Sequence, residues 1–164
     1  MLIPGATVVD LGAAPGGWTQ VATGRVGARG RVIAVDLLEI APMSGVTVLR
    51  GDFRALEVQA QIAAALGGRK ADVVLSDLSP NISGIASADQ ARAAELVRMA
   101  MEFCGMELKA DGGFLVKVFQ GEEFAGVLKN MKRMFREVRT IKPSASREES
   151  RETYLLARGL KGIQ

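Results

Sequence analysis

The sequence predicts an α/β fold built on a doubly wound, mostly parallel β-sheet. Short apolar runs rich in β-branched residues alternate with helical stretches along all 164 residues. Such runs, flanked by turn residues, are typical of parallel strands that are buried on both faces. No linker rich in proline, glycine or serine interrupts the alternation. We therefore expect a single domain that covers residues 1–164.

Seven strands are predicted, and the last two differ from the others. Five are short apolar runs bounded by turn residues, as parallel strands require. The last two follow each other without a helix between them, which predicts a terminal hairpin and therefore one antiparallel strand. In chain order the seven are Ala6–Asp10, Arg31–Asp36, Val46–Arg50, Asp72–Asp77, Gly113–Phe119, Glu137–Ile141 and Thr153–Arg158.

Four helices are predicted between these strands. They cover Gly17–Val26, Ala55–Leu66, Ala88–Leu108 and Glu122–Phe135. Ser87 is expected to cap the amino end of the long third helix, because a serine side chain there accepts a hydrogen bond from a free backbone amide. The glycines that follow Asp111 are expected to end that helix.

Composition limits the chemistry that the chain can perform. It contains one cysteine, Cys104, and no histidine. The usual Cys/His zinc sites and histidine catalysis are therefore excluded, no metal is expected, and a general base must be Lys, Asp, Glu or Tyr. No apolar run approaches the roughly 20 residues that span a bilayer, and no signal-like segment is present. We expect a cytoplasmic protein without a membrane partner.

A glycine-rich turn directly after the first strand is the strongest functional signal. In the segment from Asp10 to Trp18, glycines would let the backbone approach a ligand at the carboxyl end of a strand, where open α/β sheets bind nucleosides. The dinucleotide fingerprint G-x-G-x-x-G is not satisfied, because Ala14 stands two residues after Gly12. This mismatch favours S-adenosylmethionine over NAD. Trp18, beside Gly16, is interpreted as a wall of the cofactor pocket.

Aspartates follow four of the predicted strands. Asp10, Asp36, Asp52 and Asp77 are therefore expected along one edge of the sheet. Asp36 lies about twenty residues after Gly16, where an acid typically binds ribose hydroxyls. Asp52 is expected to address an adenine amino group. A single aspartate of this kind is often only a turn or cap residue, but four in register favour a binding site.

Lys117 lies inside an otherwise apolar strand. A lysine there is costly unless its ammonium reaches a cleft or a carboxylate, and desolvation would lower its pKa toward a value useful for proton abstraction. Asp77, at the end of the neighbouring strand, is its expected partner, and Glu152 is a second candidate.

The basic residues are concentrated near the C-terminus. From residue 129 onward the chain has ten basic residues and four glutamates, which gives this segment a charge of +6 in a chain of net charge +3. We expect Lys129, Lys132, Arg133 and Arg136 to share one helical face and, with Arg147 and Arg151, to contact RNA phosphates without reading sequence. The alternative is a solvated helix face and tail.

The motifs together resemble a known family. DLGAAPGGWTQ, AVDLL, GDF, LSDLSPNISG, DGGFLVKVFQGEEF and SREESRETYLLA are similar to the FtsJ/RrmJ ribose 2′-O-methyltransferases over essentially the whole chain. The resemblance implies a seven-stranded Rossmann-like S-adenosylmethionine-dependent methyltransferase fold. It also implies that a ribose, expected to be that of a uridine, is methylated in large-subunit ribosomal RNA, free or in the assembled subunit.

The resemblance also assigns residues. Gly16, Trp18, Asp36, Asp52 and Asp77 would hold S-adenosylmethionine. The family's Lys-Asp-Lys-Glu tetrad would be represented by Asp77, by Lys117 as proton acceptor, and by Glu152.

One part of the family pattern has no counterpart in the sequence. The family carries its first tetrad lysine and a basic RNA-binding helix before the first strand, where this sequence has only Met1–Gly5. An alternative function is therefore a cofactor-binding, RNA-associated module whose catalysis is impaired. A third interpretation, an NAD-dependent oxidoreductase, fits the sheet but not the loop. A monomer is expected.

Overall fold

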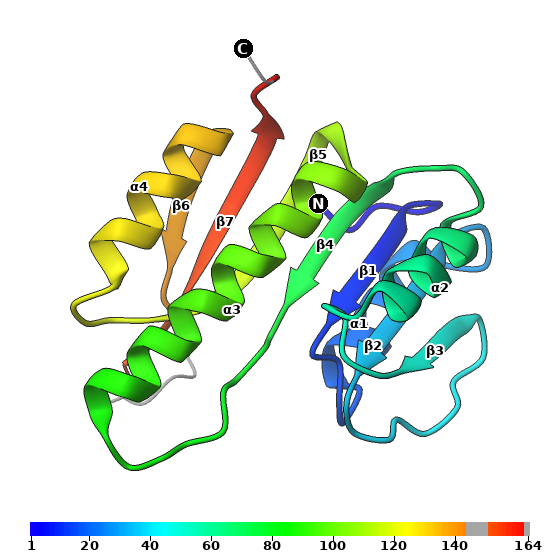
Figure 1. Cartoon of the computed structure of the whole chain (residues 1–164). Helices are drawn as coiled ribbons and strands as arrows, with labels where there is room; N and C mark the ends of the chain where they lie inside the picture. Colours follow the sequence, from blue (N-terminus) through cyan, green and yellow to red (C-terminus); the bar gives the residue numbers. More distant parts are fainter. Residues whose placement is uncertain (144–150, 163–164) are drawn as a thin grey trace.

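A computed structural model describes residues 1–143 and 151–162 and contains a seven-stranded sheet (Figure 1). Its strand order is β3-β2-β1-β4-β5-β7-β6, and only β7 runs antiparallel to its neighbours, β5 and β6. The predicted mostly parallel sheet, in which the last strand of the chain is antiparallel, is confirmed, and β7 lies between β5 and the edge strand β6. The strands are β1 Thr7–Leu11, β2 Arg31–Asp36, β3 Val46–Arg50, β4 Ala71–Ser76, β5 Leu108–Phe119, β6 Phe135–Ile141 and β7 Glu152–Leu160.

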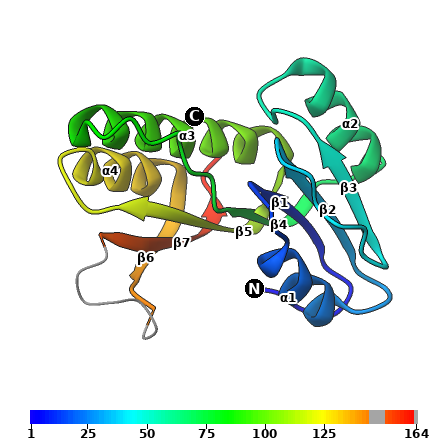
Figure 2. The same ribbon diagram turned by 90° about the horizontal axis from the view of Figure 1, so that it is seen from below.

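Four helices cover the two faces of the sheet unequally. Within the described ranges, α1 alone covers one face, and α2, α3 and α4 cover the other, as Figure 2 shows. The helices are α1 Gly17–Val26, α2 Leu56–Leu66, α3 Ala86–Glu107 and α4 Phe124–Met134. None of these helices is long and apolar enough to cross a bilayer.

Two apolar cores result from this arrangement. The larger lies between the sheet and the three helices α2 to α4, and it includes Phe114 of β5 stacked on Phe135 of β6 at 5.9 Å between ring centroids. The smaller lies under α1, where Ala22 and Val26 pack against Val8 and Val32. Side chains on alternate residues of β1 therefore enter different cores, as the period of a strand requires.

The start and the end of the long helix differ from the prediction. Ser87 does not cap α3: the cap position is Ile85, and the carboxylate of Asp89 instead accepts hydrogen bonds from the amide of Ser83 at 2.9 Å and of Gly84 at 3.2 Å. An acid inside the first turn thus satisfies the amides of the preceding loop. The helix ends at Glu107, before the predicted glycines, because Leu108 already pairs with Ala71 of β4.

Asp10 lies inside β1, not at the edge of the sheet with the other strand-end aspartates. It is fully buried, and its Oδ2 accepts a hydrogen bond from the hydroxyl of Thr19 on α1 at 2.7 Å. In the described part of the chain its Oδ1 has no hydrogen-bond partner. The pKa of this carboxyl is raised to about 7, chiefly by burial; the Thr19 hydrogen bond lowers it, and the nearby carboxylates of Asp77 and Asp36 raise it.

Asp10 therefore makes stability depend on pH. Its native pKa lies above its unfolded value of 3.8, so the native state binds more protons between those values, and stability falls as pH rises through this window. Asp10→Asn, which carries no charge, should remove that loss. Relative to the wild type, the free energy of unfolding of the variant should increase by up to about 4 kcal/mol as the pH rises from 4 to 7. Urea unfolding across this range measures the difference, and parallel curves for the two proteins would contradict the assignment.

Candidate active site

The carboxyl ends of the parallel strands form one edge of the sheet, the lower edge in Figure 1. A cavity of about 640 Å³ opens there, between the loops that follow β1 to β4 and the first turns of α3. This volume lies within the range of roughly 300–1,000 Å³ that small-molecule sites occupy. Its lining includes Asp36, Asp52, Arg54, Asp77, Ser79 and Lys117.

Asp36 ends β2, and the backbone fixes its carboxylate. Oδ2 accepts the amide of Ala14 at 2.9 Å, and Oδ1 accepts the amide of Leu38 at 2.8 Å. The first of these bonds ties the carboxylate to the glycine-rich turn after β1. Each carboxylate oxygen has a second lone pair, so Asp36 retains acceptor capacity toward a ligand.

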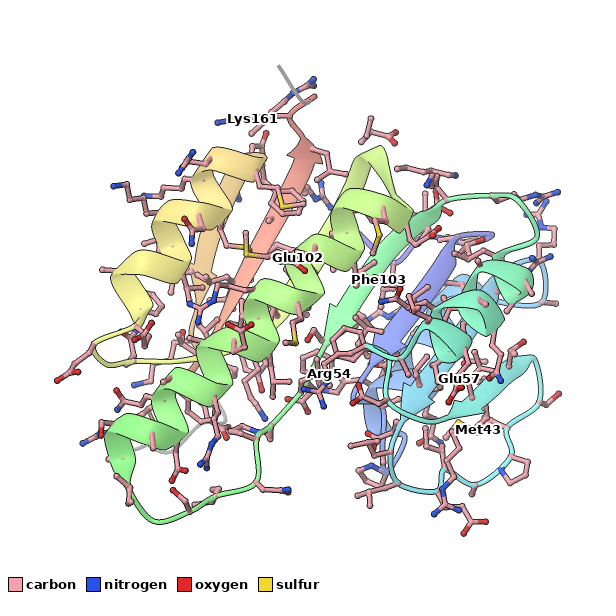
Figure 3. The ribbon with its side chains drawn as sticks, viewed as in Figure 1. Met43, Arg54, Glu57, Glu102, Phe103 and Lys161 are labelled. Carbon is pink, nitrogen blue, oxygen red and sulfur yellow. The ribbon has the colours of Figure 1, made fainter. Side chains whose placement is uncertain are left out.

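Asp52 lies after β3, and the guanidinium of Arg54 engages both of its oxygens. Arg54 Nε is 2.8 Å from Oδ1 and 2.9 Å from Oδ2, and Nη2 is 2.5 Å from Oδ2. These contacts hold the pKa of Asp52 below its usual range. Figure 3 shows Arg54 beside the lower end of the sheet, near the cavity that it lines. A ligand donor at Asp52 must share this carboxylate with Arg54.

Two glycines shape the turn after β1. Gly12 has a φ of +75°, and a Cβ at this position would lie 3.0 Å from the backbone nitrogen of Leu78. Gly16, the amino-terminal cap of α1, has a φ of +117°, and its Cβ would lie 2.4 Å from Cε of Met43. Both positions therefore require glycine. Gly12 lines the cavity, whereas Gly16 makes room for the side chain of Met43.

Lys117 lies at the centre of the site. Its Nζ lies 2.9 Å from Oδ1 of Asp77 and 2.7 Å from Oγ of Ser79, and the Phe119 ring centroid is 5.7 Å away. Only 9% of the lysine side chain is exposed. The predicted pair of Lys117 with Asp77 is present, since β4 and β5 are adjacent and parallel, and it joins the loop after β4 to β5.

Tyr154 and Glu152 lie across β5 from this pair. Tyr154 of β7 is directly opposite Lys117, and Glu152 is opposite Phe119, so these residues share one face of the sheet. Burial raises the pKa of the Tyr154 hydroxyl, and the negative charges of Asp77 and Glu152 raise it further. The Trp18 ring of α1 lies 5.6 Å from the Tyr154 ring, tilted by 44°.

The structure thus brings most of the predicted site residues together. Asp36, Asp52, Asp77 and Lys117 line one cavity. Glu152 does not line it, but lies opposite Phe119 on the face of the sheet that carries Lys117. Among the described residues, Gly16 and Trp18 lie outside the cavity lining: Gly16 caps α1, and Trp18 packs against Tyr154.

Three contributors were missed by sequence reasoning. Ser79 belongs to the quoted LSDLSPNISG motif, and Tyr154 to SRETYLLA, so the motifs contained a signal that was not used. Arg54 follows Asp52 by two residues, a spacing that alone does not predict a bidentate contact.

The basic C-terminal residues do not form one helical face. Lys129, Lys132 and Arg133 lie on α4, but the helix ends at Met134, so Arg136 belongs to β6. Arg151 directly precedes β7, at the edge that carries the cavity. Arg147 lies outside the described residues.

The cavity suits S-adenosylmethionine. Its three aspartates offer acceptors for hydroxyl, amino and cationic groups, and a backbone cradle at Gly12 leaves no space for a side chain. The glycine-rich turn that favoured this ligand over NAD in the sequence therefore lies at the cavity, which Gly12 and Ala14 line.

Comparison with known proteins agrees with this reading. The sequence pattern of the FtsJ-like methyltransferases matches residues 1–160. The chain is 52% identical, over 162 residues, to ribosomal RNA large subunit methyltransferase E of Chromohalobacter salexigens, covering 99% of this chain and 77% of that protein. To the protein of the same name from Verminephrobacter eiseniae it is 51% identical over 161 residues, covering 98% of this chain and 66% of that protein.

Solved structures share the fold. A crystal structure assigned as a ribosomal RNA methyltransferase of Plasmodium falciparum superimposes with a TM-score of 0.89 at 25% identity, covering 99% of this chain and 91% of that chain. Fibrillarin of Aeropyrum pernix, solved with natively bound S-adenosyl-L-methionine, gives a TM-score of 0.68 at 16% identity, covering 95% of this chain and 67% of that chain. The likeness to fibrillarin shows the fold alone.

These matches confirm the predictions of a Rossmann-like methyltransferase fold, of a methyltransferase activity and of S-adenosylmethionine as cofactor. The family pattern covers almost the whole chain, and two relatives exceed 50% identity. The chain belongs to the FtsJ-like methyltransferase family.

Proposed function

We propose that the chain methylates a ribose 2′-hydroxyl of large-subunit ribosomal RNA, with Lys117 as the general base. The observation that carries this proposal is the position of Lys117 Nζ, 2.9 Å from Asp77 and 2.7 Å from Ser79 on the wall of the cavity. The names of the two bacterial relatives, which are ribosomal RNA large subunit methyltransferases, support the substrate class.

The cofactor would be held by the aspartates of the strand ends. Asp36 would accept from ribose hydroxyls, Asp52 from an adenine amino group, and Asp77 would face the cationic part of the ligand beside Lys117. Gly16 and Trp18 would act indirectly, since Gly16 fixes the turn and Trp18 packs against Tyr154. When bound, S-adenosylmethionine supplies a methyl group on a positively charged sulfur.

Lys117 would act on the substrate hydroxyl. A ribose hydroxyl is a poor nucleophile at neutral pH, so a positioned base must take its proton as the oxygen gains the methyl group. The amine form of Lys117 accepts that proton. Asp77 stabilises the ammonium that results, and the Ser79 hydroxyl, which both donates and accepts, holds Nζ in either protonation state. Glu152 adds a second negative charge beside that of Asp77, and both charges act on the Tyr154 hydroxyl.

Three finer points belong to the same proposal. The methylated nucleoside is a uridine, the chain works as a monomer, and the reaction takes place in the cytoplasm, where the ribosomal substrate of a bacterial-type enzyme is assembled.

Removing the lysine should slow methyl transfer strongly and spare the cofactor site. Lys117→Met should slow single-turnover methylation of unmethylated large-subunit RNA by about 10²–10⁴-fold, the usual contribution of a general base. The dissociation constant for S-adenosylmethionine should stay within a few-fold of the wild type. The matched control is Lys109→Met, because Lys109 lies in the same strand and pairs with Asp72 at 2.6 Å. Mass spectrometry of the digested RNA locates the methyl group, and normal rates in Lys117→Met would refute the role of the lysine.

Asp36 gives an independent test of the cofactor site. Asp36→Asn should weaken S-adenosylmethionine binding by about 10- to 100-fold, because a hydrogen bond to a charged group contributes roughly 1.5–3 kcal/mol. Calorimetric titration measures the affinity, and the melting temperature reports whether the turn at Ala14 is intact. Asp72→Asn is the control, since Asp72 accepts a backbone amide, that of Thr7, at 2.8 Å without lining the cavity. Equal affinities in both variants would place the cofactor elsewhere.

A further inference from the structure

The outer edge of the sheet carries three cations, and because side chains alternate along a strand, Arg136 and Arg139 project to opposite faces of that edge. β6 is the terminal strand, and Arg136, Arg139 and Lys142 recur every third residue along it and just past its end. All three side chains are exposed. We call these three residues the basic edge. Its one acidic interruption on β6 is Glu137.

Strand register places one end of the basic edge beside the active site. Ile141 of β6 pairs with Tyr154 of β7, and Tyr154 pairs with Lys117 of β5. The three residues therefore form one row across the sheet. With strands about 4.8 Å apart, the end of the basic edge at Lys142 lies roughly 10 Å from the backbone of Lys117.

The other end of the basic edge leads to a second hollow. Arg133, Arg136, Lys161 and Gly162 line a space of about 580 Å³, which we call the far hollow. Lys161 follows the end of β7, nine residues after Glu152, so the far hollow lies roughly 30 Å from the catalytic edge at about 3.3 Å per residue. Figure 3 shows Lys161 beyond the upper edge of the sheet and Arg54 beside its lower edge.

Within the described part of the chain, the arginines of this surface are not held in ion pairs. Among residues 1–143 and 151–162, no ion pair is formed by Arg133, Arg136 or Arg139. Lys161 Nζ donates to the backbone carbonyl of Lys132 at 2.7 Å, which caps the last turn of α4. The guanidiniums of Arg133 and Arg136 therefore retain their donors for a ligand.

A charged edge strand also has a simpler explanation. Terminal strands often carry charged side chains because charge prevents them from pairing with another molecule. Charges of either sign would serve that role, and it does not require a hollow lined by cations at the end of the strand. The nearly uniform sign along the edge strand, between the active site at one end and the far hollow at the other, favours a polyanionic ligand that follows the edge.

We propose that the basic edge and the far hollow bind the phosphate backbone of the RNA substrate, leading it from the catalytic edge to the opposite end of the sheet. This inference rests on the proposed function and specifies how the same substrate is held. Contacts to phosphates supply affinity and orientation without sequence information. The substrate must then extend about 30 Å from the methylated ribose, a length set by β7.

Charge reversal at the far hollow tests this path. In Arg133→Glu/Arg136→Glu, affinity for a long RNA fragment around the methylation site should fall at least tenfold. The slope of log affinity against log salt should flatten by about 0.7 for each lost phosphate contact on a single strand. The rate of methyl transfer at saturating RNA and the affinity for S-adenosylmethionine should not change. The control is Arg25→Glu/Arg29→Glu, which makes the same charge change on exposed residues near the carboxyl end of α1.

RNA length separates this proposal from a general charge effect. A short fragment that covers only the methylated nucleotide and its neighbours should bind the far-hollow variant and the wild type equally. The proposal is overturned if the variant binds long RNA as tightly as the control does, or loses affinity equally for both lengths. It is also overturned if light scattering shows that the variant self-associates while its RNA affinity is kept, because the edge then only prevents strand pairing. Absence of methyl transfer to ribosomal RNA by the wild type would instead refute the proposed function.

Discussion

The ion pair between Lys117 and Asp77 is the constraint on which the site depends. It joins the middle of the sheet to the loop after β4 and keeps a nearly buried ammonium stable. A lysine in this apolar strand without such a partner would cost several kcal/mol or lose its charge. Ser79, two residues after Asp77, contacts the same ammonium, so the loop and the strand are positioned together.

The strand ends provide the remaining parts of the site. Parallel strands direct their carboxyl ends to one edge, so Asp36, Asp52 and Asp77 meet although 41 positions separate the first from the last. Backbone amides and Arg54 fix two of these carboxylates before any ligand binds. Preorganised acceptors of this kind reduce the cost of binding. The antiparallel strand β7 adds Tyr154 and Glu152 to the same face as Lys117.

Local patterns predicted the elements and most of the site, because strand periodicity and strand-end acids are encoded in short windows. Lys117 and Asp77 were paired correctly on this basis alone. Asp10 was misplaced because β1 extends to Leu11, which leaves the aspartate inside the strand and directs its carboxyl toward Thr19. Tyr154 was missed because its position opposite Lys117 depends on the register between β5 and β7, which no local window contains. Ser87 does not cap α3, because the helix already begins at Ala86 and Ile85 occupies the cap position without a side-chain hydrogen bond.

A double-mutant cycle on the ion pair tests the central claim most directly. Single-turnover methylation of large-subunit RNA would be measured at saturating S-adenosylmethionine for the wild type, Asp77→Asn, Lys117→Met and the double variant. If Asp77 acts on catalysis through Lys117, the double variant should be no slower than Lys117→Met alone. If the double variant is slower than the wild type by the product of the two single rate reductions, the residues act independently, and this account of the site is contradicted.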